Sequence, residues 1–227
     1  MPAVRFPVSL GLTLGTMASA LLLHRVAPQA DVAIGAGMVG GLAVVAAASD
    51  LDADDLGLAK RKWGAGLRWA GAAAGVVAVG YGLAALLPAT RNLTAESTIS
   101  WQSAVLHALV IIPLATVIPE EFAFRGVLFG LLRRESGRRV ATVVSSALFG
   151  LWHVLPALGG GAANDSAVGI LGDSTAGTVL RVVGTVIFTG LGGVVLCELR
   201  SRSGSLLAPI GLHWAINGIG ELFVVAV

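Results

Sequence analysis

The sequence predicts an all-α protein, a polytopic bundle of transmembrane helices. Of its 227 residues, 56% are hydrophobic and only 12% are charged, whereas soluble domains carry about a quarter charged residues. Seven apolar segments each approach the length of about 20 residues that a helix needs to cross a bilayer. We therefore expect one integral membrane domain over residues 1–227.

The predicted spans can be placed along the chain by their apolar runs. The first could instead be a signal peptide, but the length of its apolar run favours an uncleaved span. The fourth is too long for one straight span and contains Pro113 and Pro119. We expect a kink there, or a break that would raise the count from seven spans to eight. The seven segments are residues 7–23, 32–49, 66–87, 101–132, 139–158, 178–199 and 205–226.

The distribution of basic residues predicts the orientation of these spans. When loops are assigned alternately to the two sides of the membrane, most lysines and arginines fall on the side of the N-terminus. The positive-inside rule makes that side cytoplasmic, with the C-terminus outside. The Ala- and Gly-rich composition is typical of a GC-rich bacterial genome, so we expect a bacterial plasma (cytoplasmic) membrane. The basic side holds Arg5, Lys60, Arg61, Lys62, Arg68, Arg133, Arg134, Arg138, Arg139, Arg200 and Arg202.

Three ionisable residues lie inside the fourth span, in the segment "VIPEEFAFRGVLFGLL" at 117–132. An ionisable residue within a span is costly and is by default a sign of function. Glu121 and Arg125 are separated by four residues, so they can form an ion pair along one helix face. Glu120 points about 100° away from Glu121 and cannot share that geometry. One carboxylate is thus neutralised while the other stays available.

Polar residues of two later spans are predicted to lie at the same depth as Glu120. Counting about 1.5 Å per residue from the basic loops places His153, His213 and Asn217 roughly 17 to 22 Å into the membrane, as it does Glu120. His213 and Asn217 are four residues apart and therefore share a helix face. Side chains from three spans can meet near the bilayer centre, facing one another instead of lipid.

At these positions the chain resembles the CPBP intramembrane proteases, also called the ABI or type II CAAX prenyl endopeptidase family. Their three motifs, E-E-x-x-x-R, F-x-x-x-H and H-x-x-x-N, stand here as "EEFAFR" at 120–125, "FGLWH" at 149–153 and "HWAIN" at 213–217. The resemblance makes residues 101–227 the catalytic core, whereas residues 1–100 hold three spans without a motif. Trp152, beside a motif histidine, is expected to pack the bundle or line the site.

The resemblance implies an endopeptidase and a role for each motif residue. Glu120 and His153 would bind and activate the attacking water, with Glu120 as the general base. His213 and Asn217 would donate hydrogen bonds to the oxyanion, and Arg125 would hold Glu121. Eukaryotic members trim prenylated CAAX proteins, and similar bacterial proteins are linked to bacteriocin processing or self-immunity. The expected partner is a membrane-embedded or membrane-associated peptide or protein.

A zinc-dependent version of this chemistry stays open, because the family is often called metalloprotease. Two histidines and a glutamate form a legitimate zinc set with an open position for water. Here the ligands would be His153, His213 and Glu120 or Glu121. The metal-free version is favoured because H-E-x-x-H is absent from the sequence and because Asn217 fits an oxyanion role.

Two other functions compete with a protease. Buried Glu, His and Arg clusters also form proton relays in transporters, although no internal repeat supports a transporter fold. The second competing function is that of a non-catalytic scaffold, which only binds membrane partners. No basic patch with interleaved aromatics indicates a nucleic-acid partner. The single Cys197 excludes an internal disulfide.

Overall fold

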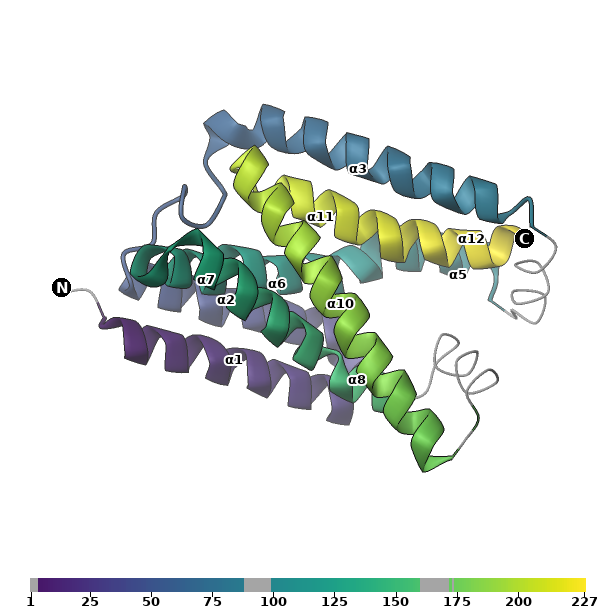
Figure 1. Ribbon diagram of the computed structural model, residues 1–227, viewed down its shortest axis with the longest axis horizontal. Coiled ribbons are helices and arrows are strands. Elements are labelled where there is room, and N and C mark those ends of the chain that lie inside the picture. Colours follow the sequence, from purple (N-terminus) through teal and green to yellow (C-terminus); the bar gives the residue numbers. More distant parts are fainter. Residues whose placement is uncertain (1–3, 88–98, 160–171, 173) are drawn as a thin grey trace.

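The computed structural model describes residues 4–87, 99–159, 172 and 174–227, and these residues form a bundle of helices without a strand (Figure 1). This architecture confirms the predicted polytopic helical membrane bundle. In chain order the helices are α1 (Phe6–Val26), η1 (Pro28–Ala30), α2 (Asp31–Ala48), η2 (Lys60–Lys62), α3 (Trp63–Ala84), α5 (Trp101–Leu106), η3 (His107–Val117), α6 (Ile118–Glu121), η4 (Phe122–Leu128), α7 (Phe129–Trp152), α8 (Val154–Leu158), α10 (Thr175–Ser203), α11 (Leu207–Trp214), η5 (Ala215–Ile219) and α12 (Gly220–Ala226).

Six helical stretches in the described residues are long and apolar enough to cross a membrane. The longest, Trp101–Leu158, reverses its direction at Gly137, whose backbone angles of φ 80° and ψ 171° interrupt the helix. Only glycine adopts this region of backbone space without strain. The reversal gives this stretch two passes, which reconciles the six stretches with the seven predicted spans.

The fourth predicted span does not break at its prolines. Helical backbone angles continue from α5 to the start of α7, but two segments, η3 and η4, have the wider π-helical hydrogen bonding. Proline removes a backbone donor and crowds the preceding turn, and π-type widening is a known way to absorb such a disturbance. Pro113 lies inside η3, and Pro119 lies in the first turn of α6. The prolines therefore change the winding of this helix without splitting it.

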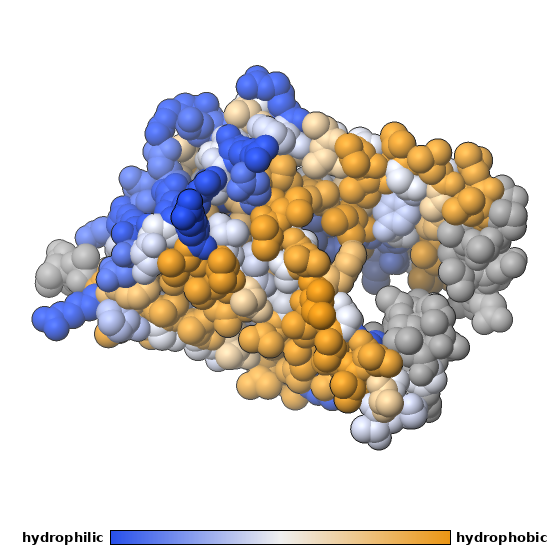
Figure 2. All heavy atoms as spheres, in the orientation of Figure 1, coloured by the Kyte–Doolittle hydropathy of each residue, from blue (hydrophilic) through white to orange (hydrophobic). Residues whose placement is uncertain are grey.

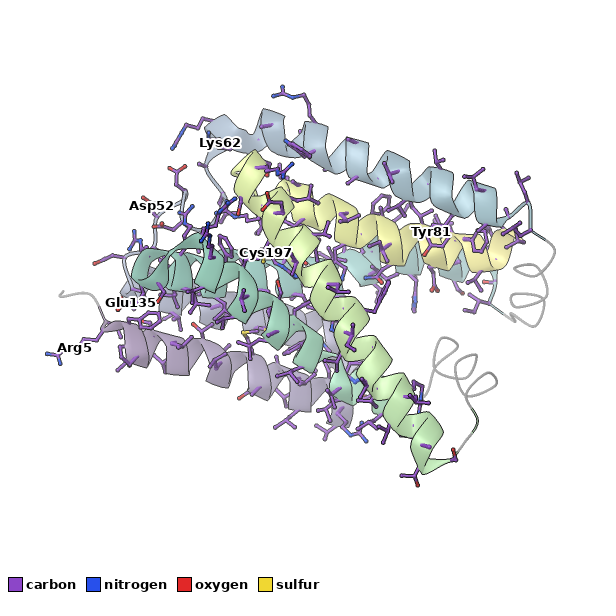
Figure 3. The ribbon with its side chains drawn as sticks, in the orientation of Figure 1. Arg5, Asp52, Lys62, Tyr81, Glu135 and Cys197 are labelled. Carbon is purple, nitrogen blue, oxygen red and sulfur yellow. The ribbon has the colours of Figure 1, made fainter. Side chains whose placement is uncertain are left out.

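Polar side chains gather at one end of the molecule, and apolar side chains cover much of the rest (Figure 2). Arg5, Asp52, Lys62 and Glu135 all lie toward that end, on the left in Figure 3, whereas Tyr81 lies toward the opposite end. Along α10 the large apolar residues Phe188 and Leu191 are 74% and 64% exposed. Exposed apolar helix flanks bounded by a charged end fit a protein surrounded by lipid.

The centre of the bundle is the segment from Pro119 to Leu132, in which every residue is buried. A helix buried on all faces needs neighbours on all sides, and α1, α2, α7 and α10 supply them. Gly150 of α7 permits a close crossing with α10, because a Cβ at that position would lie 2.6 Å from the carbonyl oxygen of Val186. The ionisable residues of this segment thus face protein, not lipid.

Candidate active site

Glu121 is the centre of a buried cluster of charged side chains. Its Oε1 atom accepts two hydrogen bonds, one from Nη1 of Arg125 and one from Nδ1 of His213, and the donor–acceptor distance is 2.8 Å in both. Glu121 and Arg125 are fully buried, and His213 is 7% exposed. The predicted ion pair between Glu121 and Arg125 is therefore present, and the last span contributes a second partner to the same oxygen.

Glu120 lies beside this cluster with a different set of contacts. Its Oε1 atom accepts a 2.8 Å hydrogen bond from the indole Nε1–H of Trp152. Its Oε2 atom is buried, has no hydrogen-bond partner among the described residues, and lies 3.9 Å from Nε2 of His213. One oxygen of this carboxylate is thus anchored, and the other is available for a further polar group.

His153 stands at the end of α7, where the backbone turns out of the helix with φ −84° and ψ 0°. Its Nδ1–H donates to the carbonyl oxygen of Phe149 over 2.8 Å, which leaves Nε2 as the ring nitrogen free for another partner. The Phe149 ring meets the imidazoles of both His153 and His213, with ring centroids 4.7 and 5.9 Å away. Phe149 therefore connects the two histidines, and Arg125 lies 4.1 Å above its centroid.

Asn217 lies in η5, the π-helical segment that follows α11, and is half-buried. In the part of the chain that the structure describes, its side chain makes no hydrogen bond. The structure thus brings Glu120, Glu121, Arg125 and His213 into contact and joins His153 to them through Phe149. Among the described residues, the Asn217 side chain forms no hydrogen bond with this cluster.

The tautomer of His213 follows from its partner. An ionised carboxylate only accepts hydrogen bonds, so Nδ1 of His213 must carry the proton that Glu121 receives. A hydrogen bond donated from Nε2 as well requires the imidazolium form. In that form the positive charges of His213 and Arg125 balance the negative charges of Glu120 and Glu121, as a buried cluster requires.

The residues do not fit a metal site in this arrangement. Among the described residues, no group of three or more His, Cys, Asp or Glu side chains could hold a metal ion. Both ring nitrogens of His213 face carboxylates, and Nδ1 is held by Glu121. The zinc set of His153, His213 and Glu120 stays a prediction, and no step below depends on it.

Trp152 is the contact that the sequence did not reveal as part of the site. The sequence predicted only packing or lining for this residue, yet its indole N–H binds Glu120 across 32 positions of the chain. An indole next to a motif histidine is equally typical of packing, so no local pattern distinguishes the two roles.

Comparison with known proteins supports the relationship that the motifs indicated. Residues 100–219, more than half of the chain, match the family model described as type II CAAX prenyl endopeptidase Rce1-like. No curated protein and no solved structure matches the chain. The matched range contains Glu120, Arg125, His153, His213 and Asn217. The chain therefore belongs to the Rce1-like family of type II CAAX prenyl endopeptidases.

Proposed function

We propose that this protein is an intramembrane endopeptidase that hydrolyses a peptide bond in a membrane-associated peptide or protein. The observation that carries the proposal is the buried carboxylate of Glu120, which is anchored through Oε1 and leaves Oε2 unpaired among the described residues. Glu121 also has an unpaired Oε2, but its Oε1 accepts from both Arg125 and His213, so this carboxylate is committed to holding two side chains in place. One of two adjacent carboxylates is thus structural, and the other is positioned for proton transfer.

In the proposed reaction, Glu120 and His153 hold the attacking water. Glu120 accepts a proton as the water oxygen bonds to the carbonyl carbon of the substrate, which forms a tetrahedral oxyanion. Nε2–H of His213 and the amide N–H of Asn217 donate to that oxyanion. When the C–N bond breaks, the proton on Glu120 passes to the leaving amine. Arg125 and Glu121 hold His213 in place throughout.

The low polarity of the bundle centre supports this assignment of roles. Hydrogen bonds to a developing charge strengthen where water is excluded, and Phe124, Phe149 and Trp152 surround the cluster with aromatic rings. The same surroundings would suit a proton relay, but a relay needs a chain of titratable groups that continues toward both membrane faces. Toward the C-terminal end of the last span, His107 and Glu221 form an ion pair 3.6 Å long, but the His107 side chain is half-exposed. This pair therefore does not extend the buried cluster into a relay.

The protein is proposed to lie in a bacterial cytoplasmic membrane with its basic end in the cytoplasm. Two of the basic residues assigned to that side, Arg5 and Lys62, lie toward one end of the bundle (Figure 3), and the positive-inside rule makes a basic end cytoplasmic. A reporter enzyme that is active only outside the cytoplasm should work when fused to the C-terminus. Activity of that reporter at the N-terminus instead would reverse the orientation.

The experiment that tests the proposed function compares wild-type protein with Glu120→Gln in detergent, using fluorogenic membrane-associated peptides as substrates. Loss of the general base should reduce cleavage by roughly 10²- to 10⁴-fold while the thermal unfolding midpoint changes little. Glu221→Gln is the matched control, because Glu221 pairs with His107 outside the cluster, and it should retain wild-type activity.

Two outcomes of this experiment would change the proposal. Full activity of Glu120→Gln would remove Glu120 from the reaction, and an intact biological function of an inactive variant would favour a scaffold. A parallel assay with 1,10-phenanthroline tests the zinc prediction. Loss of activity with the chelator and recovery with zinc would make His153 and His213 ligands instead of hydrogen-bonding groups.

A further inference from the structure

We propose that Trp152 is a positioning residue for the reaction, because its indole N–H fixes the carboxylate of Glu120 in its working orientation. The inference rests on the proposed function and extends it to Trp152, which occupies an unspecified position of the F-x-x-x-H motif at 149–153. Trp152 touches Glu120 and not the reacting atoms, so its effect on catalysis passes through Glu120.

Trp152 is the hydrogen-bond donor to Glu120 in the described part of the chain. The Nε1–Oε1 distance is 2.8 Å, and a bond to an ionised acceptor is roughly twice as strong as one between neutral groups. A glutamate side chain has three rotatable bonds, and among the described residues this is the one hydrogen bond to its carboxylate. Without it, the orientation of the Glu120 carboxylate would depend on packing and on the attraction of His213, 3.9 Å away.

The indole of Trp152 is itself held in place. Its ring packs edge-to-face on Phe124, with centroids 5.7 Å apart and planes at 80°. Phe124 is 1% exposed and packs in the same manner on Phe149, 5.1 Å away at 79°. A donor on a rigid aromatic group imposes its direction on a flexible acceptor, and not the reverse.

The hydrogen bond from Trp152 leaves one oxygen of the Glu120 carboxylate, Oε2, without a partner among the described residues. Because Trp152 occupies Oε1, Oε2 is the atom that remains, and it lies 3.9 Å from Nε2 of His213. That separation exceeds a hydrogen bond and is short enough for the two groups to act on one substrate centre. The indole of Trp152 therefore orients Glu120 so that its Oε2 faces His213.

Trp152 also links Glu120 and His153, the two residues proposed to hold the water. It is the last residue of α7, and His153 follows it directly, where the helix turns. A shift of this helix end moves the donor to Glu120 and the imidazole of His153 together. The same helix end therefore carries both the donor to Glu120 and the imidazole of His153.

Packing alone is the competing explanation for Trp152, and the two differ in what the N–H contributes. Trp152→Phe keeps an aromatic ring and removes the donor. We expect kcat to fall by about 10- to 100-fold, the cost of misplacing a reacting group, while KM stays within about twofold. Trp63→Phe is the control, because Trp63 donates the same indole N–H to the carbonyl oxygen of Leu58, 3.2 Å away and outside the cluster. It should retain wild-type kcat.

A second variant separates the donor from the volume of the ring if Trp152→Phe folds poorly. Incorporation of 3-benzothienylalanine at position 152 replaces the N–H by sulfur and keeps the bicyclic shape. We expect the same loss of kcat with an unchanged thermal midpoint. Wild-type kcat in this variant would overturn the inference, because the donor would then be dispensable.

A double-mutant cycle adds a readout that a packing role would not produce. Glu120→Asp keeps the carboxylate but shortens it by one methylene, so it no longer reaches Trp152. In that background, Trp152→Phe should have little further effect on kcat. Two independent losses that multiply would overturn the inference while the proposed function stands. Full activity of Glu120→Gln, in contrast, would overturn the proposed function itself.

Discussion

At the scale of single residues, Glu121 makes the buried charges of the site tolerable. Removing a charge from water without a partner costs several kcal/mol, and Glu121 is fully buried. Two donors, Nη1 of Arg125 and Nδ1 of His213, share its Oε1 atom at a distance of 2.8 Å each. Glu121 therefore ties the fourth predicted span to the last one and holds His213 beside Glu120.

Arg125 is expected to matter for stability because of this burial. Arg125→Leu leaves Glu121 without its guanidinium partner, and losing one member of a buried pair typically costs about 3–5 kcal/mol. Chemical unfolding in mixed micelles should show a free energy of unfolding that is lower than the wild-type value by about this amount. Arg202→Leu is a matched control, since Arg202 and Glu198 are also four residues apart, 2.7 Å from each other, but exposed. Equal effects of the two variants would contradict the role of burial.

The sequence predicted one contact of this cluster and missed others. The four-residue spacing predicted the pair of Glu121 and Arg125, which the structure contains. The same reasoning could not show that His213 joins this pair, because helix periodicity describes neighbours within one helix only. The bond from Trp152 to Glu120 was missed for the same reason. The catalytic roles of Glu120, His153 and Asn217 stay predictions.

At the scale of secondary-structure elements, the π-helical segments are the distinctive feature of the site. Such segments are often found at functional sites, and here they carry or flank the motif residues. In each of the π-helical segments η3, η4 and η5, one backbone carbonyl accepts a hydrogen bond from a side chain of another helix. The pairs are Trp214 Nε1 with Ala108 O at 2.8 Å, Ser145 Oγ with Phe124 O at 2.9 Å, and Tyr81 OH with Ile216 O at 3.0 Å.

Tyr81 is expected to support the site from a span without a motif. Its hydroxyl donates to the carbonyl oxygen of Ile216, next to Asn217, over a distance of 3.0 Å. A Cβ at Gly220 would lie 2.6 Å from the Tyr81 hydroxyl oxygen, so the glycine leaves room for this contact. Tyr81→Phe removes this anchor, so Asn217 should be less well aligned with the oxyanion. We expect kcat to fall by about 10-fold, less than the roughly 10²- to 10³-fold cost of deleting an oxyanion donor.

The control for Tyr81 keeps the hydroxyl and changes the ring contact. Phe223 packs against Tyr81 with centroids 5.1 Å apart, and Phe223→Leu should lose some stability while kcat is retained. If Phe223→Leu reduced kcat as much as Tyr81→Phe, the packing of α3 on α12, and not the hydrogen bond, would support the site.

The sequence predicted the helices more closely than their internal winding. Apolar runs located each span to within a few residues; residues 7–23, for example, correspond to Phe6–Val26 of α1. Proline positions indicated a disturbance in the fourth span but not its form. Whether Pro113 causes a break or a π-helical segment depends on the neighbouring helices that hold the carbonyls, such as Trp214 on Ala108, and the sequence of one segment does not specify them.

At the scale of the whole molecule, the charged end is closed by the loop between α2 and α3. Arg200 of α10 is 1% exposed, and its Nη2 donates to the carbonyl oxygens of Asp54 and Asp55, each over 2.9 Å. Asp55 in turn forms ion pairs with Arg133 and Arg134. Three separate parts of the chain thus meet at this loop: the loop itself, α7 through Arg133 and Arg134, and α10 through Arg200.

Asp55 makes the stability of this end depend on pH. Burial acts to raise the pKa of its carboxyl, but the hydrogen bond from the backbone N–H of Asp52 and the contacts with Arg134 and Arg133 outweigh burial, so the pKa lies below its ordinary value. A carboxyl whose pKa is lower in the folded state binds protons more weakly there than in the unfolded state. Its contribution is therefore fully present above the unfolded value of about 4.

That contribution should disappear as the pH falls through the lower pKa of folded Asp55. Asp55→Asn removes the charge, so its thermal midpoint in detergent should lie below that of the wild type at pH 7, and the difference should shrink below about pH 4. Asp50→Asn, at an exposed position of the same loop, should match the wild type throughout. A deficit of Asp55→Asn that stays constant into the acid range would mean that the shape of this side chain, and not its charge, closes the loop over Arg133 and Arg134.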